Sequence, residues 1–179
     1  SHTCDSHRTG SGIVVVPHAK HAPGSVVALT KRCDDDSGPM PRYGRTPTGS
    51  IPQAGETFGY LAPAYACMNE RQLAIGESTF EGREELVSDK GLIDCETLTR
   101  LMLERSATAR EAIRIGGELL KQYGWCDLGE ALTIADSQEV WVLEIIGPGK
   151  DQIGAIWAAQ RVPDDHVSVV ANASRIGEI

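Results

Sequence analysis

The order of short strands, two helices and further strands along the chain predicts an α+β fold. Short β-branched runs bounded by turn residues occupy the first third, and longer apolar runs occupy the last third. Between them lie two stretches whose apolar residues recur at helical spacing. Because strands and helices are segregated along the chain, we expect helices packed on an antiparallel sheet and not a βαβ alternation.

The N-terminal part is expected to contain two strands, within residues 12–17 and 25–30. Residues 32–55 contain Asp-Asp-Asp-Ser-Gly-Pro and several further prolines, which favour a long irregular loop. Short strand segments are expected to follow at 57–60, 64–68 and 72–77.

Two helices are expected next. Asp94 is a candidate N-cap for the first, in which Leu98, Leu101, Met102 and Arg105 share one face. Thr108 and Glu111 have capping-box spacing for a second helix that ends at Gly124. The pair Gly116-Gly117 inside that helix costs about 1 kcal/mol per glycine relative to alanine, which predicts close packing against a sheet.

The C-terminal third is expected to consist of strands at 131–135, 139–146, 155–161 and 167–171. Residues 136–138 have the composition of a hairpin turn.

The composition fits one domain and limits the partners. With 179 residues, 41% of them hydrophobic and 5% aromatic, the chain can form a single core built mainly from aliphatic side chains. A formal net charge of −8 argues against a nucleic-acid partner, which would require a basic surface. No apolar run reaches transmembrane length, so no membrane partner is expected.

The five cysteines are odd in number, widely spaced and without a Cys-x-x-Cys pair. This pattern favours reduced thiols over a disulfide framework or zinc knuckle, and with them an intracellular location.

Two other patterns are weak indications of a catalytic or metal site. Cys4 lies near His2 and His7, but sequence proximity does not establish a Cys–His nucleophile. The His18-x-x-His21 pair lacks a third zinc ligand, so no metal site is expected.

Six segments in the same order resemble the dipeptidase/secernin family of N-terminal-nucleophile (Ntn) hydrolases. They are Thr-Cys-Asp-Ser-His (3–7), Met-Asn-Glu (68–70), Ala-Ile-Gly-Glu (74–77), Arg-Glu-Glu-Leu (83–86), Ile-Ala-Asp-Ser-Gln-Glu-Val-Trp-Val-Leu-Glu (134–144) and Arg-Val-Pro-Asp-Asp-His-Val-Ser-Val-Val-Ala-Asn (161–172). The resemblance implies a four-layer αββα sandwich and amide hydrolysis through an acyl-enzyme on an N-terminal cysteine. It implies neither a metal nor an organic cofactor.

The same resemblance implies three catalytic residues. Asp5 matches the aspartate that holds the terminal amine, Asn69 an asparagine beside the substrate carbonyl, and Asn172 the asparagine that donates to the oxyanion. Each has a structural alternative: Asp5 as the cap of a turn, Asn69 as a left-handed turn residue, and Asn172 as a strand terminus.

Two further residues are candidates for substrate binding. Glu77 is suited to a substrate amino group and Arg175 to a substrate carboxylate, although both residue types are usually solvated. If Asp5 is the family aspartate, the nucleophile lies upstream of Ser1. We therefore expect residues 1–179 to be an incomplete Ntn-hydrolase domain. His2 stands where the family commonly has arginine, which leaves the role of that position open.

The sequence thus predicts a cysteine-type dipeptidase that acts on short peptides, inactive as this fragment alone. Two alternatives remain: a related amidase acting on non-peptide amides, and a secernin-like protein that acts through partners. A homo-oligomer is compatible with either.

Overall fold

A seven-stranded antiparallel sheet organises the chain in the computed structural model, which describes residues 12–35, 42–63 and 65–177. Its strands run in the spatial order β1 (Val14–Val16), β6 (Tyr60–Ala62), β7 (Met68–Asn69), β8 (Ala74–Glu81), β9 (Gly129–Ala135), β10 (Val140–Ile146) and β11 (Ile156–Val162). Every neighbouring pair is antiparallel. With two helices beside this sheet, the predicted α+β class is confirmed.

Two smaller sheets accompany the main one. One joins β3 (Val26–Asp35) to β4 (Arg42–Pro52), and the other joins β2 (Ala19–Lys20) to β5 (Glu56–Thr57). A short 3-10 helix, Glu84–Leu86, follows β8. Strand segments expected at 57–60 and 64–68 are instead the two-residue and three-residue strands β5, β6 and β7.

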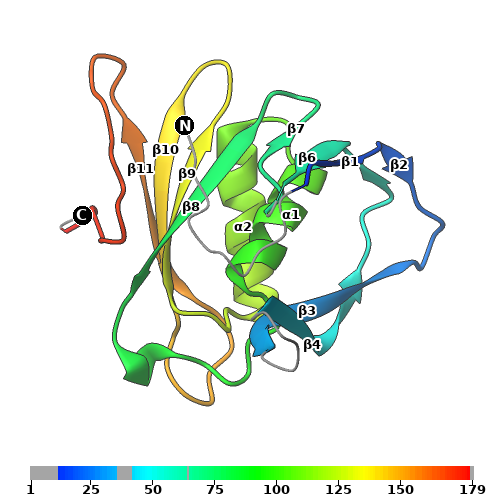
Figure 1. Ribbon diagram of the computed structural model, residues 1–179, viewed down its shortest axis with the longest axis horizontal. Helices are drawn as coiled ribbons and strands as arrows, with labels where there is room; N and C mark the ends of the chain where they lie inside the picture. The colour runs from blue at the N-terminus through cyan, green and yellow to red at the C-terminus, as the bar shows by residue number, and fades with distance from the viewer. Residues whose placement is uncertain (1–11, 36–41, 64, 178–179) are drawn as a thin grey trace.

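Helices α1 (Cys95–Arg105) and α2 (Ala109–Tyr123) cover one face of the sheet, and the chain after β11 passes over the other (Figure 1). As predicted, Leu98, Leu101 and Met102 on α1 are buried in the core. Arg105 of the same predicted face directs its guanidinium to the Pro52 carbonyl. Neither described helix has the length and apolarity needed to cross a membrane.

Both predicted helix caps are present. The Asp94 carboxylate accepts a hydrogen bond from the Thr97 amide at 2.9 Å, and a second from the Arg32 amide of β3. Thr108 Oγ1 accepts from the Glu111 amide at 3.3 Å. In a capping box Glu111 would accept in return from the amide of the cap residue, Thr108. Here its carboxylate accepts instead from the amide of Ala107, one residue before the cap.

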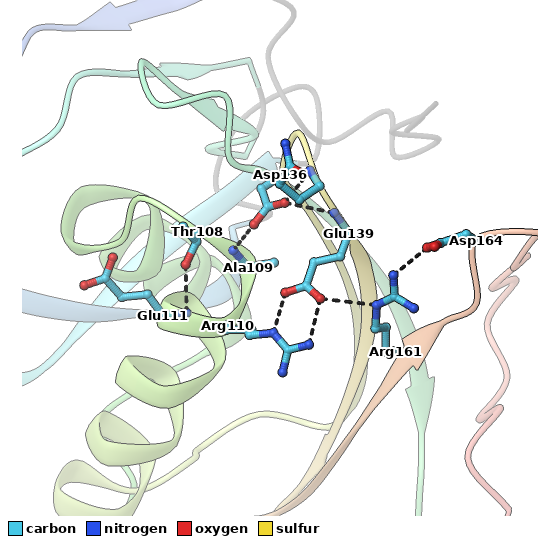
Figure 2. Close-up of polar contacts among 9 residues, drawn as sticks. Thr108, Ala109, Arg110, Glu111, Asp136, Glu139, Arg161 and Asp164 are labelled. Carbon is cyan, nitrogen blue, oxygen red and sulfur yellow. Dashed lines mark hydrogen bonds and ion pairs between the residues drawn. The ribbon is translucent and has the colours of Figure 1, made fainter.

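The turn between β9 and β10 holds the start of α2, as Figure 2 shows. Asp136 Oδ1 accepts from the amides of Gln138 and Glu139, which closes the predicted hairpin turn. Its Oδ2 accepts from the Ala109 amide at the first residue of α2. Glu139 then binds Arg110 of α2 through both carboxylate oxygens, at 2.6 and 2.9 Å. One tight turn therefore fixes a helix to two strands.

The paired glycines of α2 lie at two close contacts. A Cβ on Gly117 would lie 2.6 Å from the Trp157 ring of β11, and a Cβ on Gly116 would lie 3.1 Å from the Met102 sulfur of α1. The predicted packing against a sheet is therefore correct for Gly117. Gly116 instead allows the two helices to approach each other.

The prediction of an irregular loop at 32–55 was wrong for residues 32–35 and 42–52, and residues 36–41 lie outside the described part of the chain. Within the described residues, β3 and β4 form a long antiparallel ribbon. Its register shifts between Leu29 and Thr30, where Pro47 pairs with Thr30. Proline is tolerated beside a bulge and in a strand that lacks a second neighbour, because no ladder bond requires its missing N–H. Leu29 and Ile51 anchor the ribbon in the core.

The prediction of a strand at 167–171 was also wrong. These residues form no strand in the described structure, and Val167 and Val169 are 93% and 68% exposed. Their apolar alternation resembles a strand, but strand formation depends on a partner and a buried face. The segment that follows is held by side chains of the main sheet instead.

The Asp136 turn makes a testable contribution to stability. Burial alone would raise the pKa of Asp136, but hydrogen bonds from the Ala109, Gln138 and Glu139 amides hold that pKa below its usual range. We expect Asp136→Asn to lower the free energy of unfolding by about 0.5–1 kcal/mol at neutral pH, because bonds to a charged acceptor are stronger.

The pH dependence has a definite sign. Since the folded pKa is depressed, the stabilisation is present above the unfolded pKa and is lost as pH falls through the folded pKa. Denaturant unfolding should therefore show the gap between wild type and Asp136→Asn closing in acid. The exposed Asp164, which pairs with Arg161 at the surface, provides the control Asp164→Asn, with little effect. A gap that does not change with pH would contradict this account.

Candidate functional site

The C-terminal segment crosses the face of the main sheet that lies opposite the helices. Glu144 of β10, which is 7% exposed, anchors it there. One carboxylate oxygen accepts from the backbone amides of Arg175 and Ile176, and the other accepts from Ser174 Oγ at 2.6 Å. A buried carboxylate requires such partners, so Glu144 and the segment stabilise each other.

Asn172 lies in the same segment and contacts β8. Its backbone amide donates to Ser78 Oγ at 2.8 Å, and its Nδ2 donates to the Thr79 carbonyl at 2.7 Å. The backbone φ is 48°, a left-handed conformation that asparagine adopts more readily than most residues. An amide nitrogen carries two hydrogens, so the bond to Thr79 fixes the side chain and leaves one hydrogen to donate.

Arg175 follows Asn172 on this face. Its backbone is bound to Glu144, its side chain is exposed, and no acidic group pairs with the guanidinium among the described residues. A cation in this state is available to a carboxylate ligand. Asn172, Ser174 and Arg175 are thus brought together beside Ser78 and Glu144.

Asn69 is placed elsewhere and is saturated by the fold. It is 4% exposed, and its Nδ2 donates at 2.8 Å to the carbonyls of both Leu103 and Ser106. Its Oδ1 accepts from the amides of Arg71 and Leu73. These bonds tie the β7–β8 turn to the end of α1, which is a positioning role. The predicted contact of Asn69 with substrate stays a prediction.

Glu77 lies on the helix side of the sheet, because successive residues of a strand point to opposite faces and Ser78 points to Asn172. There Glu77, Cys95 of α1 and Glu130 of β9 each bring one oxygen or sulfur atom to within 4.8 Å of the others. Cys95 and Glu130 are buried, and Glu77 is half-buried. The structure therefore separates Glu77 from Asn172 and Arg175.

Burial has the largest effect on the pKa of Glu130 and on the pKa values of three of the thiols. It raises the pKa of Glu130 to about 8, with added repulsion from Glu77 and Asp127, while a bond from Thr79 and the charge of Arg32 act in the opposite direction. Burial also raises the pKa of Cys95 well above its usual value, and that of Cys126 to about 12. The pKa of Cys67 is raised for the same reason. These thiols are thus poor sources of a thiolate nucleophile.

His18 and His21 do not share a site. The His18 ring lies between Glu70 at 2.7 Å and Glu56 at 2.8 Å, and the bond to Glu70 contributes most to a raised His18 pKa. His21 contacts Thr57 Oγ1 at 3.0 Å. Asp5 and Cys4 lie outside the described residues.

Two relevant carboxylates were not singled out from the sequence, although each left a signal. Glu144 interrupts Val-Trp-Val-Leu-Glu-Ile-Ile, and Glu130 precedes Ala-Leu-Thr-Ile. An acidic residue inside an apolar strand is rarely buried without a partner, so both positions indicated a specific contact. The partners themselves are far away in sequence and could not be inferred.

A sequence model of peptidase family C69 matches residues 41–179. The chain belongs to this family. It is 30% identical over 166 residues to a protein named probable dipeptidase B from Lactococcus lactis subsp. lactis (strain IL1403), covering 93% of this chain and 33% of that protein. It is 29% identical over 145 residues to a probable dipeptidase from Latilactobacillus sakei, covering 77% of this chain and 27% of that protein.

These findings confirm the dipeptidase resemblance that the motifs carry. The chain spans about a third or less of the length of these relatives.

The anchoring role of Glu144 can be tested by hydrogen exchange in the full-length protein. Glu144→Ala removes a charged acceptor shared by two backbone amides, a loss of about 1.5–3 kcal/mol. We expect the amides of Arg175 and Ile176 to exchange about 10–100-fold faster. Glu139→Ala, which removes a carboxylate bound by the side chains of Arg110 and Arg161, is the control and should leave the exchange of these amides unchanged. Unchanged exchange in Glu144→Ala would show that other contacts hold the segment.

Proposed function

We propose that the protein carrying this chain is a cysteine-type dipeptidase that hydrolyses short peptides. Membership of peptidase family C69 supports a hydrolase acting on peptide bonds, and the names of the two relatives support dipeptides as substrates. Peptides are favoured over non-peptide amides as substrates because both relatives are named dipeptidases.

The proposed mechanism is that of an N-terminal-nucleophile hydrolase. A cysteine at the mature N-terminus of the complete protein attacks the peptide carbonyl and uses its own α-amine as the base, since that amine titrates near neutrality. The raised pKa values of Cys67, Cys95 and Cys126 are consistent with a nucleophile other than these three. Asp5 is proposed to hold the terminal amine.

Asn172 carries the structural part of the proposal. It is exposed, its side chain is oriented by the bond to Thr79, and one amide hydrogen is left for a developing oxyanion. Arg175 next to it is proposed to bind the carboxylate of a short peptide. Glu77 lies on the opposite face, so the proposal gives it no contact with the substrate at this position.

The architecture is compatible with this assignment. The resemblance implies an αββα sandwich, in which the outer helices cover one face of each sheet. In the described part of the chain, α1 and α2 cover one face of the main sheet (Figure 1). Asn172 is bound to Ser78 on the other face. The second sheet and its helices belong to the proposal.

The decisive experiment compares Asn172→Ala with wild type in the full-length protein, assayed on a dipeptide panel. If the amide stabilises the oxyanion, kcat should fall about 10²–10³-fold with little change in KM. Ser78→Ala is the matched control, because it removes the other contact of Asn172 and keeps the amide. It should cost far less activity.

Melting temperature is measured on the same samples, since Asn172 also binds β8. A folded Asn172→Ala protein with normal kcat would overturn the role of Asn172. Turnover of acyl amides without turnover of any dipeptide would instead support the amidase alternative.

A further inference from the structure

The cluster formed by Glu77, Cys95 and Glu130 has no part in the proposed peptidase mechanism. It lies on the helix side of the sheet, and its members come from β8, the first residue of α1 and β9. One ligand atom from each lies within 4.8 Å of the other two. Glu77 is half-buried, whereas Cys95 and Glu130 are buried.

Glu130 provides a second and independent observation. It is 2% exposed, and its Oε1 accepts a hydrogen bond from Thr79 Oγ1 at 2.6 Å. Its Oε2 is fully buried and has no hydrogen-bond partner within the described part of the chain. Leaving a buried carboxylate oxygen unsatisfied is costly, so this atom requires a ligand that the surrounding residues do not supply.

A second buried glutamate, Glu104, differs from Glu130 in how its charge is balanced. It is also buried with an unpartnered Oε2, but its Oε1 accepts from the Arg100 guanidinium at 3.1 Å, so a cation balances its charge directly. The other two ligand atoms beside Glu130 belong instead to another carboxylate and a thiol, and the charge of Arg32 also acts on Glu130. That combination resembles a set of metal ligands more than an ion pair.

We propose that Glu77, Cys95 and Glu130 bind a divalent cation of borderline softness, such as Zn²⁺. A cysteine ligand disfavours Mg²⁺ and Ca²⁺, which prefer oxygen-only sites, whereas mixed sulfur and carboxylate ligands suit Zn²⁺. With bonds of about 2.0–2.3 Å, tetrahedral ligand atoms are separated by roughly 3.3–3.8 Å. Small side-chain rotations from the observed separation reach this geometry, and water completes the coordination.

The site would be structural. It joins the start of α1 to β8 and β9, and the proposed substrate-binding residues lie across the sheet. The sequence alone predicts no metal here, because the three ligands are separated by 17 and 34 residues and match no known spacing. The sheet register and the position of α1 bring them together.

The test uses the full-length protein, stripped with a chelator and titrated with Zn²⁺ and with Co²⁺ as a spectroscopic substitute. Wild type should bind one Zn²⁺ and melt at a higher temperature with the metal present. Co²⁺ should produce the near-ultraviolet charge-transfer band of a cobalt–thiolate bond. Cys95→Ser should abolish the band, and both Cys95→Ser and Glu130→Gln should weaken Zn²⁺ binding at least about tenfold.

Cys126→Ser and Glu104→Gln are the controls, since both residues are buried like Cys95 and Glu130 and neither belongs to the cluster. They should keep the band and the affinity. If wild type binds neither metal, or if Cys95→Ser keeps the band, the proposal is wrong. The wild-type spectrum decides this even if a variant fails to fold. Because none of these measurements uses peptidase activity, their outcome is independent of the proposed function.

Discussion

The register of β8, β9 and β10 is the constraint on which the rest of the structure depends. Ala131 of β9 pairs with Ser78 on one side and with Glu144 on the other, so all three share one face. Glu130, the next residue along β9, pairs with Thr79 and with Ile145 on the helix face. A slip of one residue in any of these strands would exchange the two faces. In β10 the slip would turn the Glu144 carboxylate toward the helices and remove the anchor of the C-terminal segment.

That register is held by apolar packing on the helix face and by hydrogen bonds at the turn of the hairpin. On the helix face, Leu132, Ile134, Leu143 and Ile145 are almost completely buried against α1 and α2, and a slip would expose them. At the turn, Asp136 uses one oxygen for the hairpin and the other for the first amide of α2. Burial of apolar area supplies most of the free energy, at about 25 cal/mol per Å², but it is non-directional. The hydrogen bonds of the turn are directional and fix this one register.

The sequence predicts well those features that local chemistry determines. The Asp94 and Thr108 caps, the Gly124 stop and the 136–138 turn depend on neighbours within a few residues, and all are present. Features that depend on distant partners were missed. Prolines suggested a loop where β3 and β4 pair, and the apolar alternation at 167–171 suggested a strand where no partner is described.

The same distinction applies to the candidate site. The motifs drew attention to Asn172 and Arg175, but the residues that position them are far away in the sequence. Ser78 lies 94 positions before Asn172, and Glu144 lies 31 positions before Arg175. Asn69 illustrates the converse. Its motif suggested chemistry, whereas four backbone contacts now account for its burial. A polar residue in a motif can be required for the shape of a site without touching the substrate.

Strand β8 connects the two sides of the molecule. Within three consecutive residues, Glu77 faces the helix-side cluster, Ser78 accepts from the Asn172 amide, and Thr79 contacts both sides. The Thr79 hydroxyl donates to Glu130, while its carbonyl accepts from the Asn172 side chain. Both described contacts that fix Asn172 thus come from β8. Thr79 therefore links the buried carboxylate of Glu130 on one face to the Asn172 side chain on the other through two hydrogen bonds, although the two residues do not meet.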